Sequence, residues 1–228
     1  MQHAHTIVFC DFDGTISEDN TLVQVLYRYA KNTDPETEKK LWKKEITLSE
    51  GVRYFMEHIP SASYGDIVEF SRKIRPRPGF AEMLQVFKQQ DMPFVILSGG
   101  LAFMAREALR PYEALIADIR AVEIDASGPD FKVIAPYDDG VELVAKRSVI
   151  KEYSYDRMIF IGDGDTDFEV IKDADVIFAC DDLAEHLKKT ACRFLSSIIF
   201  STSSVRCRSE RKERKVEVYD KRAIQLIA

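Results

Sequence analysis

The sequence predicts an α/β fold, a doubly wound, mostly parallel sheet with a small all-helical domain inserted after the first strand. Three observations indicate this class. Short β-favouring runs alternate with amphipathic helical patterns over most of the chain, as in parallel sheets that helices cover on both faces. A purely helical stretch, residues 17–76, interrupts that alternation once. Polar motifs directly follow three predicted strands, where such sheets bind their ligands.

The charge of the chain is unevenly distributed. The net charge of the 228 residues is −6, but residues 196–228 hold eight basic and four acidic side chains. This tail therefore carries +4 and leaves −10 on the rest. The charge of −10 on residues 1–195 argues against a general nucleic-acid-binding protein. An anionic ligand would have to be attracted by local positive charge.

No pattern in the chain predicts export or membrane insertion. No apolar run reaches the roughly 18–20 residues of a membrane helix, and residues 1–5 lack the pattern of a signal peptide. The cysteines show no paired or zinc-binding spacing, which fits a reducing compartment. We expect a cytoplasmic protein with no nucleic-acid or membrane partner. The cysteines are Cys10, Cys180, Cys192 and Cys207.

The first strand, residues 6–10, runs into two carboxylates, Asp11 and Asp13, followed by Gly14 and Thr15. Two acids crowded at the end of a buried strand repel one another and lose hydration, so a hard divalent cation between them is expected. In extended backbone both carboxylates share a face. If the chain turns at Gly14, one acid offers its carboxylate and the other its backbone carbonyl. The alternative is a loop acid pair that binds nothing.

Residues 17–76 predict a compact insertion of about four helices. Apolar residues recur at helical spacing in residues 22–30, and a capping-box pattern opens a third helix over residues 47–59. Residues 63–73 predict the fourth. The proline-containing stretch 75–79 predicts a stiff linker back to the main domain. Two linkers of this kind suit a lid that opens and closes, and a rigid helical subdomain is the alternative.

Beyond residue 79 strands and helices alternate again, and two further polar motifs end strands. Ser98-Gly99-Gly100 follows one strand and the acidic run Gly162–Asp167 follows another. The expected strands are residues 93–97, 116–124, 131–135, 157–161 and 176–180, and the expected helices are residues 80–87, 103–109, 146–153 and 183–189.

Four motifs in order resemble the haloacid dehalogenase superfamily over residues 6–190: Asp11-Phe12-Asp13-Gly14-Thr15, Ser98-Gly99-Gly100, Lys146 and Gly162 through Asp167. The helical insertion resembles the type-one cap of the phosphoserine-phosphatase-like branch. Within that branch, residues 49–61 and 96–100 are most similar to the methionine-salvage phosphatases that act on 2-hydroxy-3-keto-5-methylthiopentenyl-1-phosphate.

The resemblance implies a Mg²⁺-dependent phosphomonoesterase that works through an aspartyl-phosphate intermediate. Asp11 would be the nucleophile, and Asp13 would protonate the leaving oxygen and then activate water. Mg²⁺ would be bound by the Asp11 carboxylate, the Asp13 carbonyl and Asp163.

The resemblance also assigns residues to the phosphate. Ser98 and the Gly99 amide would donate hydrogen bonds to phosphoryl oxygens at a helix N-terminus, and Lys146 would offset charge in the transition state as a further catalytic residue. A solvated helix lysine is the alternative for Lys146. Asp167 would orient the metal shell or Lys146.

The expected organisation is a catalytic α/β core (residues 1–16 and 77–195), a helical cap (17–76) and an atypical basic tail (196–228). The partner would be a small phosphorylated metabolite, and the protein would be a monomer or homodimer. The alternatives are a phosphoserine-phosphatase-like hydrolase and a catalytically weak phosphate-binding protein. Candidates in the insertion for choosing the substrate are Glu18, Arg53, Tyr54 and His58.

Overall fold

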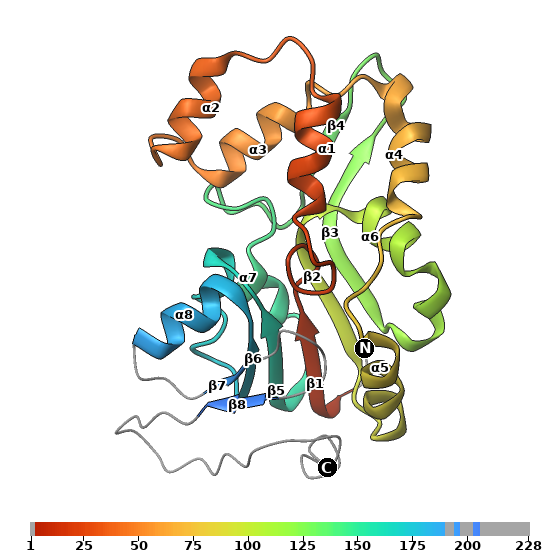
Figure 1. Cartoon of the computed structure of the whole chain (residues 1–228), viewed down its shortest axis with the longest axis vertical. Helices are drawn as coiled ribbons and strands as arrows, with labels where there is room; N and C mark the ends of the chain where they lie inside the picture. Colours follow the sequence, from red (N-terminus) through yellow and green to blue (C-terminus); the bar gives the residue numbers. More distant parts are fainter. Residues whose placement is uncertain (1–2, 190–193, 197–202, 206–228) are drawn as a thin grey trace.

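A computed structural model of the chain describes residues 3–189, 194–196 and 203–205. These residues form one eight-stranded sheet in the order β4-β3-β2-β1-β5-β6-β7-β8 (Figure 1). Neighbouring strands are parallel except at the two edges, where β3 pairs with β4 and β7 with β8 in antiparallel fashion. The strands are β1 (Ala4–Cys10), β2 (Phe94–Leu101), β3 (Asp118–Asp125), β4 (Lys132–Ile134), β5 (Tyr155–Gly162), β6 (Val176–Ala179), β7 (Phe194–Ser196) and β8 (Ser203–Val205).

Strand β1 is buried on both faces, as the central strand of a doubly wound sheet must be. Ile7 and Phe9 belong to one hydrophobic cluster, together with residues of helix α7 (Lys146–Ile150). Val8 and Cys10 belong to a second cluster with the apolar face of helix α5 (Phe80–Gln89). The predicted fold class, a mostly parallel sheet with helices on both faces, is confirmed. The remaining helical elements of the core are α6 (Ala102–Leu109), η2 (Arg110–Leu115), η3 (Asp165–Asp167) and α8 (Asp181–Lys189).

Four α-helices form the insertion that follows β1, at the top of Figure 1. The capping box predicted from the sequence opens the third, because Thr47 accepts a hydrogen bond from the Glu50 amide and the Glu50 carboxylate accepts one from the Thr47 amide. Buried side chains of the insertion, such as Val25, Met56 and Ile67, belong to the cluster on the Phe9 face of the sheet. The helices are α1 (Thr21–Tyr29), α2 (Pro35–Trp42), α3 (Leu48–Met56) and α4 (Tyr64–Ser71), with the short helix η1 (Ser61–Ser63) before the last.

The turn between β3 and β4 is bonded to the insertion through its backbone. The Ser61 amide donates to the Pro129 carbonyl at 2.8 Å, and the Phe131 amide donates to the Ile59 carbonyl at 2.9 Å. Residue Pro60 forms an isolated bridge with Asp130 between these two bonds. The insertion is therefore attached to the core at a point distant in sequence from its two linkers.

A second attachment joins helix α3 to the loop that precedes α7. The Asp138 carboxylate accepts hydrogen bonds from the Ser49 hydroxyl at 2.7 Å and from the Arg53 guanidinium at 2.7 Å. The Ser49 amide donates to the Val141 carbonyl at 2.8 Å. Burial raises the pKa of Asp138, but the bonds from Arg53, the Gly140 amide and Ser49 outweigh it and hold this pKa below its usual value.

The structure differs from the expected elements at several places, and strand β7 is one that was not predicted. Strand β2 runs on to Leu101, past the expected end at residue 97, because its pairing with β3 shifts register between Leu97 and Leu101 rather than stopping. Helix α7 ends at Ile150, before the expected residue 153. Strand β8 lies within the expected tail, where no strand was predicted, because the open edge of β7 offers backbone groups to pair with. The rest of the tail, residues 197–202 and 206–228, lies outside the described residues.

We expect Asp138→Ala to lower the free energy of unfolding by about 1 kcal/mol at pH 7, because it removes hydrogen bonds to a partly screened carboxylate. A carboxylate whose pKa is depressed by folding stabilises the protein above its unfolded pKa, and this contribution is lost as pH falls through the folded pKa. The difference from wild type should therefore shrink below about pH 4. Urea unfolding at both pH values measures it, and Glu113→Ala, at an exposed site, is the control.

Candidate active site

The site lies where the carboxyl ends of β1, β2 and β5 come together in the middle of the sheet. Asp11 directly follows β1, Asp163 directly follows β5, and Ser98 lies near the end of β2. Strand β1 pairs with β2 on one side and with β5 on the other. The chain order thus reverses at β1, and open α/β sheets bind ligands at such a reversal.

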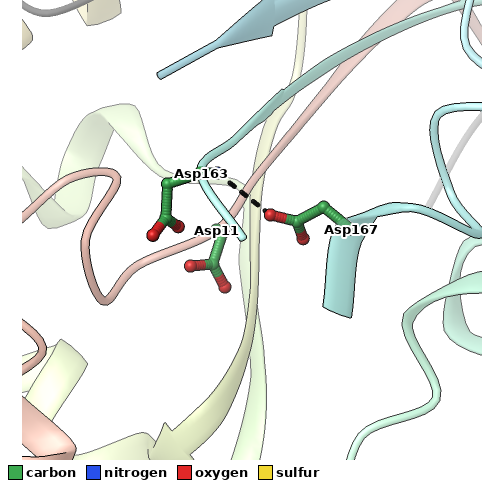
Figure 2. Close-up of side chains that lie close together, drawn as sticks. All are labelled: Asp11, Asp163 and Asp167. Carbon is green, nitrogen blue, oxygen red and sulfur yellow. Dashed lines mark hydrogen bonds between the residues drawn. The ribbon is translucent and has the colours of Figure 1, made fainter. Parts of the chain in front are cut away.

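Three aspartates form a carboxylate cluster at this point, shown in Figure 2. One carboxylate oxygen from each of Asp11, Asp163 and Asp167 lies within 4.8 Å of the other two. Burial raises the pKa of Asp11 well above its usual value; Lys146 opposes this, and the charges of Asp167 and Asp163 raise it further. Burial also raises the pKa of Asp163. Burial is the main cause of both shifts, and the neighbouring carboxylates add to it.

Lys146, the first residue of α7, is buried and lies between two of these carboxylates. Its Nζ donates to Asp11 Oδ1 at 2.6 Å and to Asp167 Oδ1 at 2.7 Å, and the Thr166 hydroxyl lies at 3.3 Å. Burial lowers the pKa of Lys146, but the charges of Asp11 and Asp167 outweigh burial and raise it above the usual value. The amine therefore stays cationic, and the alternative of a solvated lysine does not describe this residue.

Both carboxylate oxygens of Asp167 are engaged by the protein. Oδ1 accepts from Lys146, and Oδ2 accepts from the backbone amides of Asp163 at 3.1 Å and Gly164 at 3.2 Å (Figure 2). A Cβ on Gly162 would lie 2.3 Å from Oδ2, so only glycine fits there. Asp167 therefore holds the ammonium of Lys146 and the loop that carries Asp163. Asp11 and Asp163 accept fewer hydrogen bonds from the protein than Asp167 does.

Asp13 points its carboxylate toward the helical insertion. Its Oδ1 accepts hydrogen bonds from the Thr21 amide at 2.6 Å, the Thr21 hydroxyl and the Leu22 amide at 3.1 Å, all in the first turn of α1. Burial raises the pKa of Asp13, and these donors oppose it. A Cβ on Gly100 would lie 2.7 Å from Asp13 Oδ2, which places Asp13 between α1 and the end of β2.

The loop after Asp13 supports Asp163. The Thr15 hydroxyl donates to Asp163 Oδ1 at 2.8 Å. Gly14 has a φ of +82°, and a Cβ there would lie 2.2 Å from Asp163 Oδ2. A side chain at position 14 would therefore strain the backbone and push the Asp163 carboxylate aside.

Ser98, Gly99 and Gly100 lie within the irregular end of β2 and not in a loop beyond it. The Ser98 side chain is buried, and its oxygen accepts a hydrogen bond from the Gly100 amide at 3.0 Å. Gly99 is exposed. Helix α6 begins at Ala102, close behind this motif.

The four candidates in the insertion do not meet at the carboxylate cluster through any described contact. Arg53 binds Asp138, Tyr54 accepts from the Asp34 amide, the His58 ring contacts the Tyr54 carbonyl at 2.7 Å, and Glu18 is exposed. The sequence analysis gave no role to four residues that contact the site. Asn20 caps α1, and this signal could have placed Thr21 near Asp13. Thr15 and Thr166 lie within the first and the last motif, whereas no local pattern marks Arg77.

The donor set fits a hard divalent cation. Asp11, Asp163 and Asp167 bring three buried or half-buried carboxylates to one point, against one ammonium from Lys146. Carboxylate oxygens are the ligands that such cations prefer. The cysteines among the described residues, Cys10 and Cys180, are buried free thiols that pack as core side chains.

The chain matches the haloacid dehalogenase-like hydrolase family over residues 8–172, more than half of its length. It therefore belongs to this family, as the order of its motifs predicted. No helix among the described residues is long and apolar enough to cross a membrane.

Two curated relatives carry the name 2-hydroxy-3-keto-5-methylthiopentenyl-1-phosphate phosphatase. The one from Microcystis aeruginosa strain NIES-843 is 35% identical over 184 residues, which cover 80% of this chain and 88% of the relative. The one from Bacillus cereus is 32% identical and covers 76% of this chain and 83% of the relative. These relatives confirm the predicted enzyme class, a phosphatase of the haloacid dehalogenase-like type.

Solved structures share the fold at low identity. A phosphoserine phosphohydrolase-like protein from Francisella tularensis has a TM-score of 0.59 at 22% identity, covering 77% of this chain and 87% of that protein. A phosphoserine phosphatase solved as an analogue of its phospho-aspartyl intermediate has a TM-score of 0.60 at 17% identity, covering 89% and 96%.

We expect Gly14→Ala to lower the free energy of unfolding by at least about 1–2 kcal/mol, because alanine disfavours the positive φ and its Cβ would collide with Asp163. Gly65→Ala is the matched control. Gly65 lies in α4 with open space around its Cα, so alanine there should stabilise the protein by about 0.5–1 kcal/mol. Urea unfolding of both variants measures the contrast, and a change of the same sign in both would contradict the prediction.

Proposed function

We propose that the protein is a Mg²⁺-dependent phosphomonoesterase that hydrolyses 2-hydroxy-3-keto-5-methylthiopentenyl-1-phosphate, a step of methionine salvage, through an aspartyl-phosphate on Asp11. The observation that carries the chemistry is the buried Asp11 carboxylate, held by Lys146 at a strand end beside Asp163. The substrate is supported by the names of the two relatives, which align with most of this chain.

In this proposal Asp11 is the nucleophile. A carboxylate oxygen forms a bond to phosphorus while the bond from phosphorus to the leaving oxygen breaks. The bond from Lys146 to Oδ1 orients the Asp11 carboxylate. Lys146 also supplies a fixed cation that stabilises charge on the phosphoryl group.

Asp13 is the general acid and base of the proposed reaction. It lies two residues after the nucleophile, and burial raises its pKa, which favours a protonated carboxyl that can donate to the leaving oxygen. Once the leaving group has departed, the deprotonated Asp13 can take a proton from the water that attacks the aspartyl-phosphate.

Mg²⁺ would be held by Asp11, Asp163 and the Asp13 carbonyl, and when bound it neutralises phosphate charge that would otherwise repel the nucleophile. Asp167 would act indirectly, by holding Lys146 and the Asp163 loop. Ser98 and the exposed Gly99 amide are proposed to bind phosphoryl oxygens beside α6.

We further propose that residues 17–76 act as a cap over a core of residues 1–16 and 77–195. Two contacts support this division, since the first turn of α1 binds Asp13 and the Lys44 ammonium lies 3.6 Å from Asp165 in the acidic loop. Lys44 and Asp165 are both well exposed, so this ion pair adds little stability. A cytoplasmic location and a monomer or homodimer remain part of the proposal.

The substrate test measures phosphate released from the methylthiopentenyl phosphate and from phosphoserine, each with Mg²⁺. We expect selective turnover of the first, and Asp11→Asn should lower kcat on the order of 10³-fold or more. Selective turnover of phosphoserine would favour the alternative substrate. Binding of phosphate without turnover of either compound would favour the phosphate-binding protein.

The role of Asp13 can be tested with two leaving groups. We expect Asp13→Asn to release nitrophenol from p-nitrophenyl phosphate in a burst that matches the enzyme concentration, because this leaving group needs no proton. Steady turnover should fall by about 10²–10⁴-fold, since the base for the second step is lost. With an alkyl phosphate no burst should appear. Asp19→Asn, at an exposed position in the same loop, is the control, and equal slowing of the first step for both substrates would exclude this role.

A further inference from the structure

We infer that Arg77 is a positioning residue for the active site, where it fixes the peptide between Gly14 and Thr15 and thereby the carboxylate of Asp163. The inference rests on the proposed function for its effect on turnover. Its structural part concerns the shape of the first-motif loop alone. Arg77 lies in the linker from the helical insertion to α5, 63 residues from Gly14 in the sequence.

The guanidinium of Arg77 reaches the back of the first-motif loop. One terminal nitrogen donates to the Gly14 carbonyl at 2.7 Å and lies 3.2 Å from Asp181 Oδ2. The side chain is only 11% exposed, although Asp181 is 58% exposed. A hydrogen bond from a charged donor to a backbone carbonyl in a largely buried place is stronger and better defined than a surface ion pair.

The Gly14 carbonyl belongs to a peptide whose two ends both support Asp163. On one side, Gly14 has a φ of +82° and its Cα faces the Asp163 carboxylate closely enough to exclude any Cβ. On the other side, the Thr15 hydroxyl donates to Asp163 Oδ1 at 2.8 Å. A rotation of this peptide would move the glycine and the threonine together, so a bond to its carbonyl restrains both contacts.

Arg77 is itself held at a fixed place. Its amide donates to the Ile16 carbonyl at 2.7 Å, and Ser17 forms an antiparallel bridge with Pro76. Asp181 has a positive φ of 45°, which is unusual for a residue other than glycine, at the first position of α8. The carboxylate and the linker thus orient the guanidinium from two directions toward Gly14.

The two linkers of the insertion therefore meet at the loop that holds the nucleophile. Ile16 and Ser17 belong to the outgoing linker, and Pro76 and Arg77 to the returning one. Arg77 joins this pair to the Gly14 carbonyl. A purely structural arginine would affect stability alone, whereas a positioning residue should affect the cation affinity of the site and the chemical step.

The experiment compares Arg77→Met, Arg77→Lys and Arg75→Met in the full-length protein. Arg75 is exposed two residues earlier in the same linker and serves as the matched control. Four quantities are measured: kcat and KM with p-nitrophenyl phosphate, the Mg²⁺ dissociation constant by calorimetry without substrate, and the free energy of unfolding in urea.

We expect Arg77→Met to lower kcat roughly tenfold or more and to weaken Mg²⁺ binding several-fold, with little change in KM. Arg77→Lys should restore part of both losses, because lysine keeps a cation that can donate to the Gly14 carbonyl but lacks the planar guanidinium that fixes the direction of the donor. Arg75→Met should match wild type in every measurement.

Wild-type kcat and Mg²⁺ affinity in Arg77→Met would overturn the inference, even if the variant unfolds more easily. If Arg77→Met does not fold, Arg77→Lys decides: a partial loss of Mg²⁺ affinity supports positioning, and wild-type values for both quantities overturn it. Failure of the proposed function would look different. In that case the wild-type protein itself would release no phosphate from any substrate, while the calorimetric comparison would still test Arg77.

Discussion

The placement of one buried ammonium between two buried carboxylates decides the organisation of this site. Lys146 is bonded to Asp11, at the end of β1, and to Asp167, after β5. The charges of both acids keep the pKa of the buried lysine high, and loss of the lysine would leave two buried acids without their cationic partner. The same three residues join two strand ends to the start of α7, so the electrostatic contact also fixes the relative position of three elements of the fold.

Most of the fold follows from local patterns in the sequence. The sequence predicted the buried strand β1, the capping box at Thr47 and the helical insertion after the first strand, because each depends on residues close together in the sequence. The end of β2 could not be predicted in the same way. Strand pairing beyond Leu97 depends on a register shift against β3, and no residue of the Ser98-Gly99-Gly100 motif indicates that shift.

The site was predictable in its membership and less so in its geometry. Asp11, Asp163, Asp167 and Lys146 were identified by motif order, and the structure brings their side chains together. The contact of Arg77 with Gly14 joins segments whose proximity only the folded chain establishes. Arg53, one of the candidates for choosing the substrate, is bonded to Asp138.

The backbone bonds between the insertion and the β3–β4 turn bear on how such a protein could move. Ser61 and Phe131 tie the two parts together in the manner of a short sheet, at the end far from the linkers. Any swing of the insertion must either drag that turn along or rupture both bonds. If the bonds hold, the β3–β4 hairpin at the edge of the sheet would move with the insertion, and β3 would have to bend together with the two linkers.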